Sequence, residues 1–341
     1  MVRREQRVDV DQVARFRELP CARIHAHDAE QYRCGVAAAG LIVVAGEALI
    51  DLVPADDGRL VPHPGGGPFN TARSLGRLGR PVAYLGRVST DRFGARLAGL
   101  LAEDGVRLDA HVRTDEPTTL ALVELDGHGA AAYRFYTAAT AAAGLTPEAA
   151  LGALPADAAY LHVGTLGLVL EPMADALEAL VAERAGRALV MADPNCRPTI
   201  ISDPPRYRAR LARILRGCDV AKVSDDDLAW LAPGVPPAEA ARALLAQGPS
   251  VVLLTRGAEG AVALTTTGET PVKAPPIELV DTIGAGDAFS GGWLSWWSER
   301  DLGRDDLGDH DAVAEATRFA CRVAAITCSR AGAEPPRREE L

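Results

Sequence analysis

The chain has 341 residues, of which 48% are hydrophobic, and this length and composition allow a large buried core in one α/β domain with an appendage. The 36 Lys and Arg residues against 46 Asp and Glu residues give a formal charge of −10, and the chain has no long basic run. This charge argues against nucleic acid as a partner. Small anions are still possible ligands, because backbone N–H groups can bind them within an acidic protein. The six cysteines form no C-x-x-C pair and no metal-ligand spacing with His, so we expect reduced structural thiols.

Residues 1–40 are charged and rich in Arg, with a weak helical pattern near 10–19. Little apolar surface is available there to offset the entropy of ordering, so we predict a loosely ordered or appended leader. A regulatory or oligomer-stabilising arm is the alternative. The leader lacks the apolar run of a signal peptide, and apolar runs elsewhere are too short to span a bilayer. We therefore expect a cytoplasmic protein.

From residue 41 onward, short β-branched runs alternate with helical stretches rich in Ala and Leu. This alternation predicts an α/β fold, doubly wound, with a mostly parallel central sheet and helices on both of its faces. The predicted strands are 41–46, 82–88, 159–164, 188–194, 220–224, 250–257 and 260–266. The predicted helices include 69–79, 92–105, 171–186 and 237–248, each of which closes on or near Gly.

Two stretches, at about 48–64 and 117–137, break the alternation, because each reads as two strands joined by a turn. In the second stretch the turn is Asp126-Gly127, a strong hairpin signal. Such strands have no place in a simple βα alternation, so we assign them to a small separate sheet. A small sheet at the edge of a doubly wound domain is a candidate lid.

The stretch VDTIGAGDAFSGGWLSWW, which starts at Val280, predicts a glycine-rich turn that leads into a helix. Free N–H groups at a helix start point outward, glycine lets a ligand oxygen approach, and the helix dipole adds partial positive charge. Gly284, Ala285 and Gly286 therefore form a candidate anion hole. Asp287 at its mouth is either a carboxylate that complements the helix dipole or a general base; this stretch alone leaves both open.

Two other glycine motifs are excluded by spacing. The dinucleotide motif G-x-G-x-x-G requires a small residue where Phe289 stands, and it normally follows the first strand of a domain. The motif G-x-x-x-x-G-K-[ST] occurs nowhere in the chain. A Rossmann dehydrogenase and a Walker-type NTPase are therefore disfavoured.

The sequence DTIGAGDAFSGG resembles the C-terminal signature of the ribokinase-like, pfkB-type carbohydrate kinases, and GGGPFNTARSLGRLG, from Gly65, resembles their N-terminal signature. The resemblance extends from about residue 43 to 336 and implies a ribokinase-like kinase domain over 41–336. It implies ATP-dependent phosphorylation of a sugar hydroxyl, with Asp287 as the catalytic base and Gly284, Ala285 and Gly286 as the anion hole. Asp281 is similar to a residue that shapes the adjacent loop, where some members bind a monovalent cation such as K⁺.

The same resemblance implies an acceptor pocket near the first strand. Asp51, in VVAGEALIDLVP, matches an aspartate that holds sugar hydroxyls. Gly65, Gly66 and Asn70 match further sugar contacts, and a carboxamide suits a polyol because it both donates and accepts hydrogen bonds. Without the family context, Asp51 reads as a surface carboxylate at a strand end and Asn70 as an ordinary residue of a first helical turn.

Nucleotide contacts are implied near LLTRGAEGA, which carries Thr255, Gly257 and Gly260, although glycines so placed also suit a simple hairpin turn. The stretch KVSDDDLAWL stands in the place of the family motif N-x-x-E, with Ser224 for Asn and Asp227 for Glu. Because that motif acts on Mg²⁺ largely through water, a shorter carboxylate can still serve. We expect ATP and Mg²⁺.

Further stretches, among them YRFYTAATA, HVGTLGLVLEP and DPNCRP, resemble the fructokinase branch and imply a ketohexose such as fructose as the acceptor. Asp193, Asn195 and Arg197 then lie close to the cleft, where Arg197 either faces phosphate or pairs with Asp193. Two alternatives remain open: a kinase for 2-keto-3-deoxygluconate, ribose or a nucleoside, and a non-catalytic sugar- or nucleotide-binding regulator. A homodimer through the small sheet is also expected, because pairing would bury an open sheet edge.

Overall fold

The computed structural model describes residues 40–55, 57–125 and 131–341, and these residues belong to one unit that extends from Ala38 to Leu341. The predicted leader over 1–40 and the Asp126-Gly127 turn lie outside the described residues, apart from Gly40. None of the helices in the described parts is both long and apolar enough to cross a bilayer.

An eight-stranded central sheet organises the unit, with the strand order β14-β13-β12-β11-β10-β9-β1-β4. Six neighbouring strands, from β12 to β4, run parallel, β13 runs antiparallel to β12, and the edge strand β14 runs antiparallel to β13. The mostly parallel sheet is therefore confirmed, and β14 is an additional strand that the sequence pattern did not reveal. The strands are β1 (Leu41–Ala45), β4 (Val82–Leu85), β9 (Ala158–Gly164), β10 (Leu189–Asp193), β11 (Val220–Ser224), β12 (Val251–Thr255), β13 (Ala261–Thr265) and β14 (Glu269–Val272).

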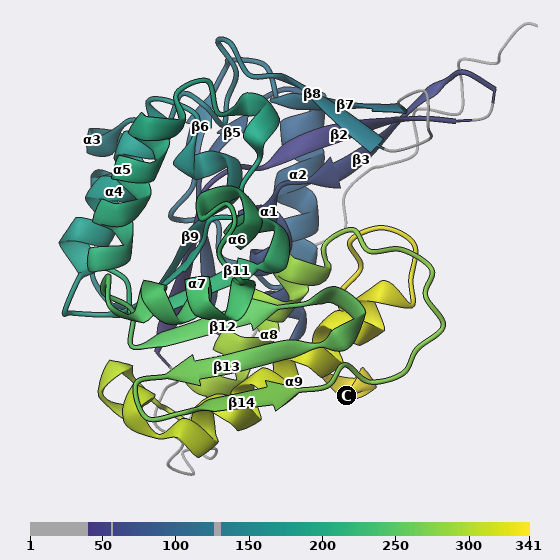
Figure 1. Ribbon diagram of the computed structural model, residues 1–341. Coiled ribbons are helices and arrows are strands. Elements are labelled where there is room, and N and C mark those ends of the chain that lie inside the picture. The colour runs from purple at the N-terminus through teal and green to yellow at the C-terminus, as the bar shows by residue number, and fades with distance from the viewer. Residues whose placement is uncertain (1–39, 56, 126–130) are drawn as a thin grey trace, which may run out of the picture. The chain divides into compact units, whose positions relative to one another are not determined.

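Helices cover both faces of this sheet (Figure 1) because successive strand residues point to opposite faces and both faces are apolar. Val43 and Leu161 pack in one core, whereas their neighbours Ile42 and Tyr160 pack in the other. The first core contains α3 (Pro147–Ala153), α4 (Met173–Arg184), α5 (Pro204–Arg216), α6 (Asp225–Leu231) and α7 (Pro237–Leu245). The second contains α1 (Gly67–Arg77), α2 (Arg92–Glu103), α8 (Ala285–Glu299) and α9 (His310–Cys328).

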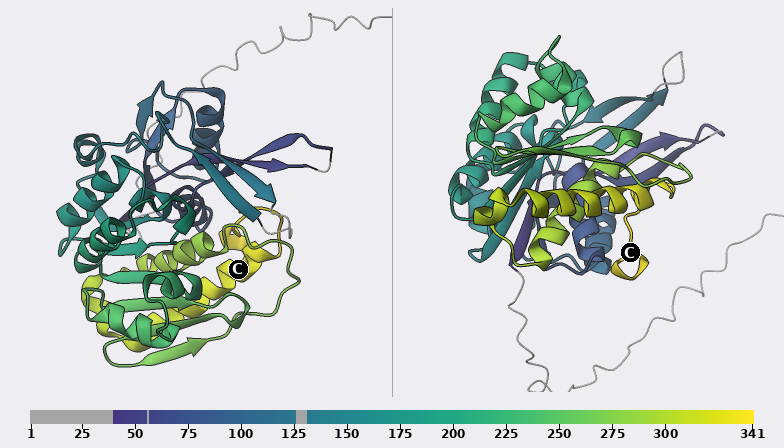
Figure 2. Two further views of the ribbon diagram at one scale, coloured as in Figure 1. Left: turned by 45° about the horizontal axis from the view of Figure 1, so that its top comes forward. Right: turned by 60° about the horizontal axis from the view of Figure 1, so that its bottom comes forward.

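The predicted small sheet is confirmed as a separate four-stranded sheet in the order β3-β2-β7-β8. Its strands are β2 (Leu49–Pro54), β3 (Leu60–Gly65), β7 (Leu120–Leu125) and β8 (Ala131–Tyr136). Figure 2 shows the sheet extending from one edge of the helix-covered central sheet. The two stretches that break the βα alternation meet where β2 pairs with β7 in parallel.

The predicted strand 82–88 is two strands. It ends as β4 and resumes as β5 (Arg87–Ser89), which pairs with β6 (Val112–Thr114) in a small parallel ladder. The break falls at Gly86, where a Cβ would lie 2.3 Å from the Tyr84 hydroxyl oxygen and 2.4 Å from the Gly46 carbonyl oxygen. Only a residue without a side chain fits between these two oxygens.

Candidate active site

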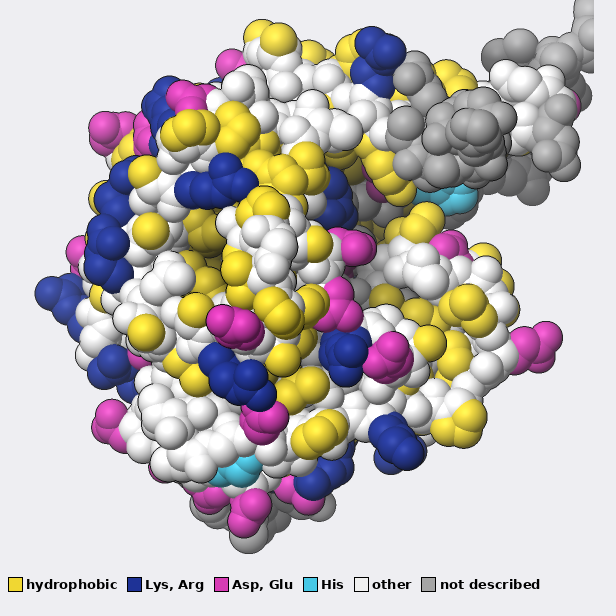
Figure 3. Space-filling view, in the orientation of Figure 1, with side chains coloured by type: hydrophobic (Ala, Val, Ile, Leu, Met, Phe, Trp, Pro, Cys, Tyr) yellow, Lys and Arg dark blue, Asp and Glu magenta, His cyan; other side chains and the backbone are white. Residues whose placement is uncertain are grey.

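A cavity of about 610 Å³ opens at the carboxyl ends of the parallel strands. Several of its lining residues stand directly after, or at the end of, a strand of the central sheet: Thr165 after β9, Ser224 at the end of β11 and Thr255 at the end of β12. The small sheet supplies the other side through Leu49, Asp51, Tyr133 and Phe135. Figure 3 shows the surface hollowed below this sheet, with acidic and basic side chains side by side at the rim.

The glycine-rich turn borders this cavity at the start of α8. Gly284 is the N-cap with φ 75° and ψ 0°, a left-handed conformation, and a Cβ there would lie 2.6 Å from the Ala333 Cβ. The backbone N–H groups of Gly286 and Asp287 have no hydrogen-bond partner among the described residues. The turn therefore presents free donors at a helix N-terminus, which is the arrangement an anion hole requires.

Asp287 lies in the first turn of α8. It lines the cavity, although only 8% of the residue is exposed. Its Oδ2 accepts a hydrogen bond of 2.9 Å from Asn70 Nδ2, and its backbone carbonyl accepts one of 3.3 Å from Thr71 Oγ1. Burial raises the pKa of this carboxyl to about 6, although the Asn70 hydrogen bond acts in the opposite direction. A carboxylate with that pKa is a stronger base than an exposed aspartate.

A buried ion pair, Lys222–Asp193, lies beside the turn. Lys222 Nζ is 2.8 Å from Asp193 Oδ2, and the two side chains are 5% and 1% exposed. Burial opposes the charge on Lys222, but the carboxylates of Asp193, Asp227 and Asp287 together outweigh this effect and raise the pKa of the ammonium. A Cβ on Gly286 would lie 2.8 Å from Nζ, so the absent side chain lets the ammonium reach the turn.

The Lys222–Asp193 pair decides between the two roles predicted for Arg197, which were to face phosphate or to pair with Asp193. Lys222, and not Arg197, is the ion-pair partner of Asp193. The Arg197 side chain lines the cavity and donates from Nη1 to Asn195 Oδ1 at 2.6 Å and to the carbonyl oxygens of Asn195 and Cys196 at 3.2 Å. Arg197 therefore stays available to an anion in the cavity.

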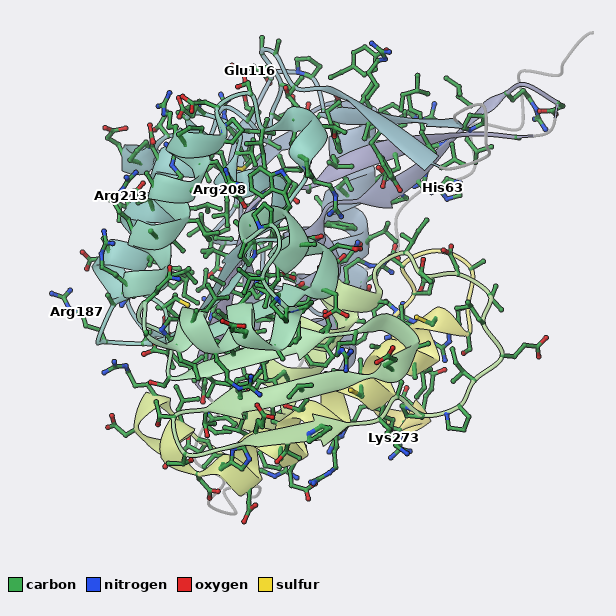
Figure 4. All side chains as sticks on the ribbon, viewed as in Figure 1. His63, Glu116, Arg187, Arg208, Arg213 and Lys273 are labelled. Carbon is green, nitrogen blue, oxygen red and sulfur yellow. The ribbon has the colours of Figure 1, made fainter. Side chains whose placement is uncertain are left out.

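The predicted acceptor residues gather where the small sheet meets the start of α1. Asp51, Gly66 and Asn70 line the cavity, whereas Gly65 lies behind Asp51. A Cβ on Gly65 would lie 2.1 Å from Asp51 Oδ2, so this glycine makes room for the carboxylate. Burial raises the pKa of Asp51 to about 6. Figure 4 shows His63, which pairs with Asp51 across β2 and β3, below the small sheet on the side of the hollow.

Of the predicted nucleotide residues, Ser224, Thr255 and Gly257 line the cavity. Gly260 does not line it. With φ 97° and a prospective Cβ 2.0 Å from the Val272 carbonyl oxygen, Gly260 instead closes the turn between β12 and β13, as the hairpin alternative predicted. Arg256 adds a cation at this side, 3.5 Å from Asp225 Oδ2.

Asp227 has a different task from the predicted one. Its Oδ2 accepts hydrogen bonds from the Ser224 backbone N–H at 2.8 Å and the Ser224 hydroxyl at 2.7 Å, while Oδ1 accepts from the Cys196 N–H at 2.6 Å. Ser224 and Asp227 thus form the capping box of α6, and Asp227 turns away from the cavity. Its neighbours Asp225 and Asp226 line the cavity. The geometry favours these two carboxylates for water-mediated contact with a cation.

Asp281 joins two loops. Its Oδ1 accepts from the Ile283 N–H at 3.0 Å, and its Oδ2 accepts from the Gly332 N–H at 2.8 Å. This agrees with a loop-shaping role. Within the described ranges, no group of three or more His, Cys, Asp or Glu side chains could hold a metal ion, and Cys196, Cys218, Cys321 and Cys328 are free thiols.

Sequence reasoning missed Glu47, Thr165 and the role of Lys222. Glu47 follows β1 by two residues in the stretch that carries Asp51, and a charged residue so close to the end of a buried strand was an available signal. Lys222 stands inside the apolar strand β11, where a lysine needs a buried partner. Arg187, Arg208 and Arg213, labelled in Figure 4, lie around α4 and α5 and do not line the cavity.

The comparisons with known proteins agree with the predicted family resemblance and fold. The family model described as "pfkB family carbohydrate kinase" matches residues 39–340. The curated fructokinase of Rhizobium leguminosarum bv. trifolii is 37% identical over 75% of this chain and 79% of its own. The fructokinase of Xylella fastidiosa, solved with bound ATP, has a TM-score of 0.80 and 29% identity, and the match covers 86% of this chain and 93% of that one.

A third similar protein is the fructokinase of Vibrio cholerae O395, solved in fructose-, ADP- and calcium-bound form. It has a TM-score of 0.77 and 27% identity, and the match covers 87% of this chain and 95% of that one. Together, the relatives confirm the predicted resemblance to the fructokinase branch and the ribokinase-like fold class.

The Lys222–Asp193 pair yields a stability prediction. Lys222→Met should lower the free energy of unfolding by about 3–5 kcal/mol, because Asp193 would remain buried without its cation. Urea denaturation followed by tryptophan fluorescence measures the change. The double variant Lys222→Met/Asp193→Leu, which removes both charges, should recover most of the loss. A single variant as stable as the native protein would contradict the buried pair.

Proposed function

The chain belongs to the pfkB family of carbohydrate kinases, and on that premise we propose that it transfers the γ-phosphoryl group of ATP to a hydroxyl of a ketohexose such as fructose. It is a fructokinase-like, ATP-dependent sugar kinase. The observation that supports the proposed chemistry best is the Asp287 carboxylate, buried beside free N–H groups at the start of α8 and within the cavity.

Asp287 is the proposed general base. It takes the proton of the acceptor hydroxyl as the phosphoryl group moves in line, and the raised pKa of its carboxyl suits proton transfer near neutral pH. Gly284, Ala285 and Gly286 form the proposed anion hole, in which the free N–H groups of Gly286 and Asp287 stabilise charge on the phosphoryl oxygens, whereas the Ala285 N–H donates to the Thr282 carbonyl oxygen at 3.3 Å. Lys222 and Arg197 add positive charge on the same side of the cavity.

The sugar is proposed to bind against Asp51, Gly66 and Asn70, with Gly65 shaping the pocket behind Asp51. Carboxylate, backbone and carboxamide together offer acceptors and donors to a polyol. Asn70 donates to Asp287, and this contact supports an acceptor pocket next to the proposed base.

The nucleotide is proposed to bind along Ser224, Thr255 and Gly257, with Gly260 fixing the turn that presents them. Mg²⁺ is proposed to arrive with ATP, held mainly by phosphate oxygens and water, since Asp225 and Asp226 are the carboxylates that face this part of the cavity. When bound, the ion would neutralise phosphate charge. The Asp281 loop is the proposed place for K⁺. Both carboxylate oxygens of Asp281 already accept hydrogen bonds from backbone N–H groups, so backbone carbonyl oxygens would have to supply most of the ligands of the ion.

The small sheet is the proposed lid, which excludes water from the reacting groups. It is also the proposed homodimer contact, because it exposes Leu60 at 49%, Val61 at 38% and Tyr136 at 50%. A cytoplasmic location remains part of the proposal. The leader over 1–40 is proposed to be a loosely ordered appendage of the kinase domain over 41–336.

A coupled assay of ADP release over a panel of sugars tests the function. Fructose should give the highest kcat/KM, above 2-keto-3-deoxygluconate, ribose and nucleosides. A preference for another member of the panel would select a kinase with that acceptor. No ADP release with any sugar, together with retained binding of sugar or ATP, would favour a non-catalytic regulator.

Asp287→Asn should lower kcat by at least about 100-fold, because the amide cannot accept the proton. The affinity for ATP and sugar, measured by calorimetry, should change by no more than about threefold, since Asn keeps the size of the side chain. In the native enzyme, kcat/KM should decline as the pH falls through about 6, where Asp287 becomes protonated. A variant with native turnover would show that another group is the base.

Asp51→Ala should act on the acceptor instead. Loss of a charge-assisted hydrogen bond to a sugar hydroxyl should raise the KM for the sugar by roughly 10- to 100-fold, while the KM for ATP stays within about twofold. Steady-state kinetics with each substrate varied in turn separates the two effects. An unchanged sugar KM would place the acceptor elsewhere in the cavity.

A further inference from the structure

The Glu47 carboxylate lies at the end of β1, where three segments that line the cavity meet. It is 1% exposed, yet it borders the cavity. Its Oε1 accepts hydrogen bonds from the Gly67 N–H, at 3.1 Å, and from the Thr165 hydroxyl, and its Oε2 accepts one from the Gly167 N–H, at 3.0 Å. Among the described residues it has no cationic partner. Three hydrogen-bond donors, from Gly67, Thr165 and Gly167, therefore hold this buried carboxylate.

The segment that follows β9 is held in an uncommon conformation. Thr165 has φ 58°, in the left-handed region that β-branched residues rarely adopt. Thr165 is the first residue of the 3₁₀ helix η2 (Thr165–Leu168). The backbone N–H of Gly167, in the same helix, also donates to Glu47. Two bonds to one carboxylate therefore fix this turn and offset its backbone strain.

The segment on the other side is the start of α1. A Cβ on Gly67 would lie 2.3 Å from Thr165 Cγ2 and 3.2 Å from Asp287 Oδ1, so Gly67 is packed between the threonine and the proposed base. Asn70, one turn further along α1, donates to Asp287. Any displacement of Gly67 would thus move the acceptor pocket relative to Asp287.

We propose that Glu47 is a positioning residue of the kinase, which in its ionised form clamps the start of α1 to the turn after β9 and so sets the acceptor pocket against Asp287. The inference rests on the proposed function for its kinetic readout. The ionised form can accept from all three partners at once, and two of them, the Gly67 and Gly167 N–H groups, can only donate. A protonated carboxyl that directed its O–H toward either N–H group would lose that bond, whereas the Thr165 hydroxyl could accept a hydrogen bond from that O–H.

The clamp is therefore sensitive to pH. Burial raises the pKa of Glu47 to about 7, and its hydrogen bonds to Thr165, Gly67 and Gly167 oppose that rise. The titratable groups around it are Asp51 on β2, Tyr84 on β4 and Asp287 on α8. Tyr84 stays neutral, since burial and the charge on Glu47 raise the pKa of its hydroxyl well above the ordinary value.

Kinetics of the native enzyme and of Glu47→Gln with fructose and ATP test the clamp. The amide has only one acceptor oxygen, so its NH₂ group must face the N–H of Gly67 or of Gly167. The variant should lose about tenfold or more in kcat/KM for fructose, whereas the KM for ATP should stay within about twofold. In log(kcat/KM) against pH, the native enzyme should lose activity in an acid step near pH 7, and the variant should lack this step.

Thr165→Val provides a second variant of nearly native shape. It removes one donor from the carboxylate, so the upper acid step should move above pH 7. A merely structural role for Glu47 would not shift a titration in this direction.

Asp219→Asn is the matched control: this buried carboxylate also accepts a backbone N–H, from Val190 at 2.9 Å, but at the amino end of β11. It should cost stability and leave the pH profile unchanged.

Carbon-13 NMR of protein with labelled glutamate carboxyl groups gives a readout without turnover. One resonance should titrate near pH 7, be absent in Glu47→Gln and shift upward in Thr165→Val. If the native protein phosphorylates fructose but Glu47→Gln keeps its kcat/KM and acid step, the clamp is overturned. If the native protein phosphorylates no sugar while the resonance behaves as expected, the proposed function fails and the ionised clamp stands. A Glu47 carboxyl that stays protonated throughout the pH range of activity overturns the clamp as well, because only the ionised form accepts all three bonds.

Discussion

The Asp287 carboxylate keeps its buried position because a donor reaches it from Asn70, 217 residues earlier in the chain. This bond requires α1 and α8 to lie very close together. A Cβ on Gly291 would lie 2.5 Å from Ser74 Oγ, so the helices approach at this distance only because α8 carries a glycine there. The two signature stretches are therefore the two halves of one structural unit, and neither can form the site alone.

The cavity holds both acidic and basic side chains. Glu47, Asp51 and Asp287 lie toward the small sheet and the start of α1, and burial raises the pKa of each carboxyl. Lys222 reaches the glycine-rich turn from β11, and Arg197 and Arg256 add two further cations on the side of the carboxyl ends of the strands. In the proposed function, a neutral polyol would bind beside the acids, and a polyanionic nucleotide would bind beside the cations and the free N–H groups. Burial of each acid costs stability, and hydrogen-bond donors offset part of that cost for Glu47 and Asp287.

The sequence was sufficient for the parts of the fold that depend on local pattern. The parallel sheet, the separate hairpin strands and the helix after Gly284 follow from hydrophobic period, turn residues and glycine spacing. Contacts between distant segments were not accessible in this way. The choice between Lys222 and Arg197 as the partner of Asp193 depends on the pairing of β10 with β11, and Glu47 becomes important only when Thr165 and Gly67 are brought beside it. Asp227 was matched to a motif position, but the shorter side chain instead completes a helix cap.

The register of the small sheet joins the proposed acceptor pocket to the proposed lid. Asp51 pairs with Ala121, and Ala121 pairs with Phe135, so these three side chains form one row across β2, β7 and β8 on the same face of the sheet. Ala121 is small, and Asp51 and Phe135 both line the cavity from this row. Any movement of the sheet therefore carries the polar and the apolar contacts of the acceptor together. The strand that holds Asp51 also begins two residues after Glu47, so the proposed clamp at the end of β1 would anchor the chain where the proposed lid begins.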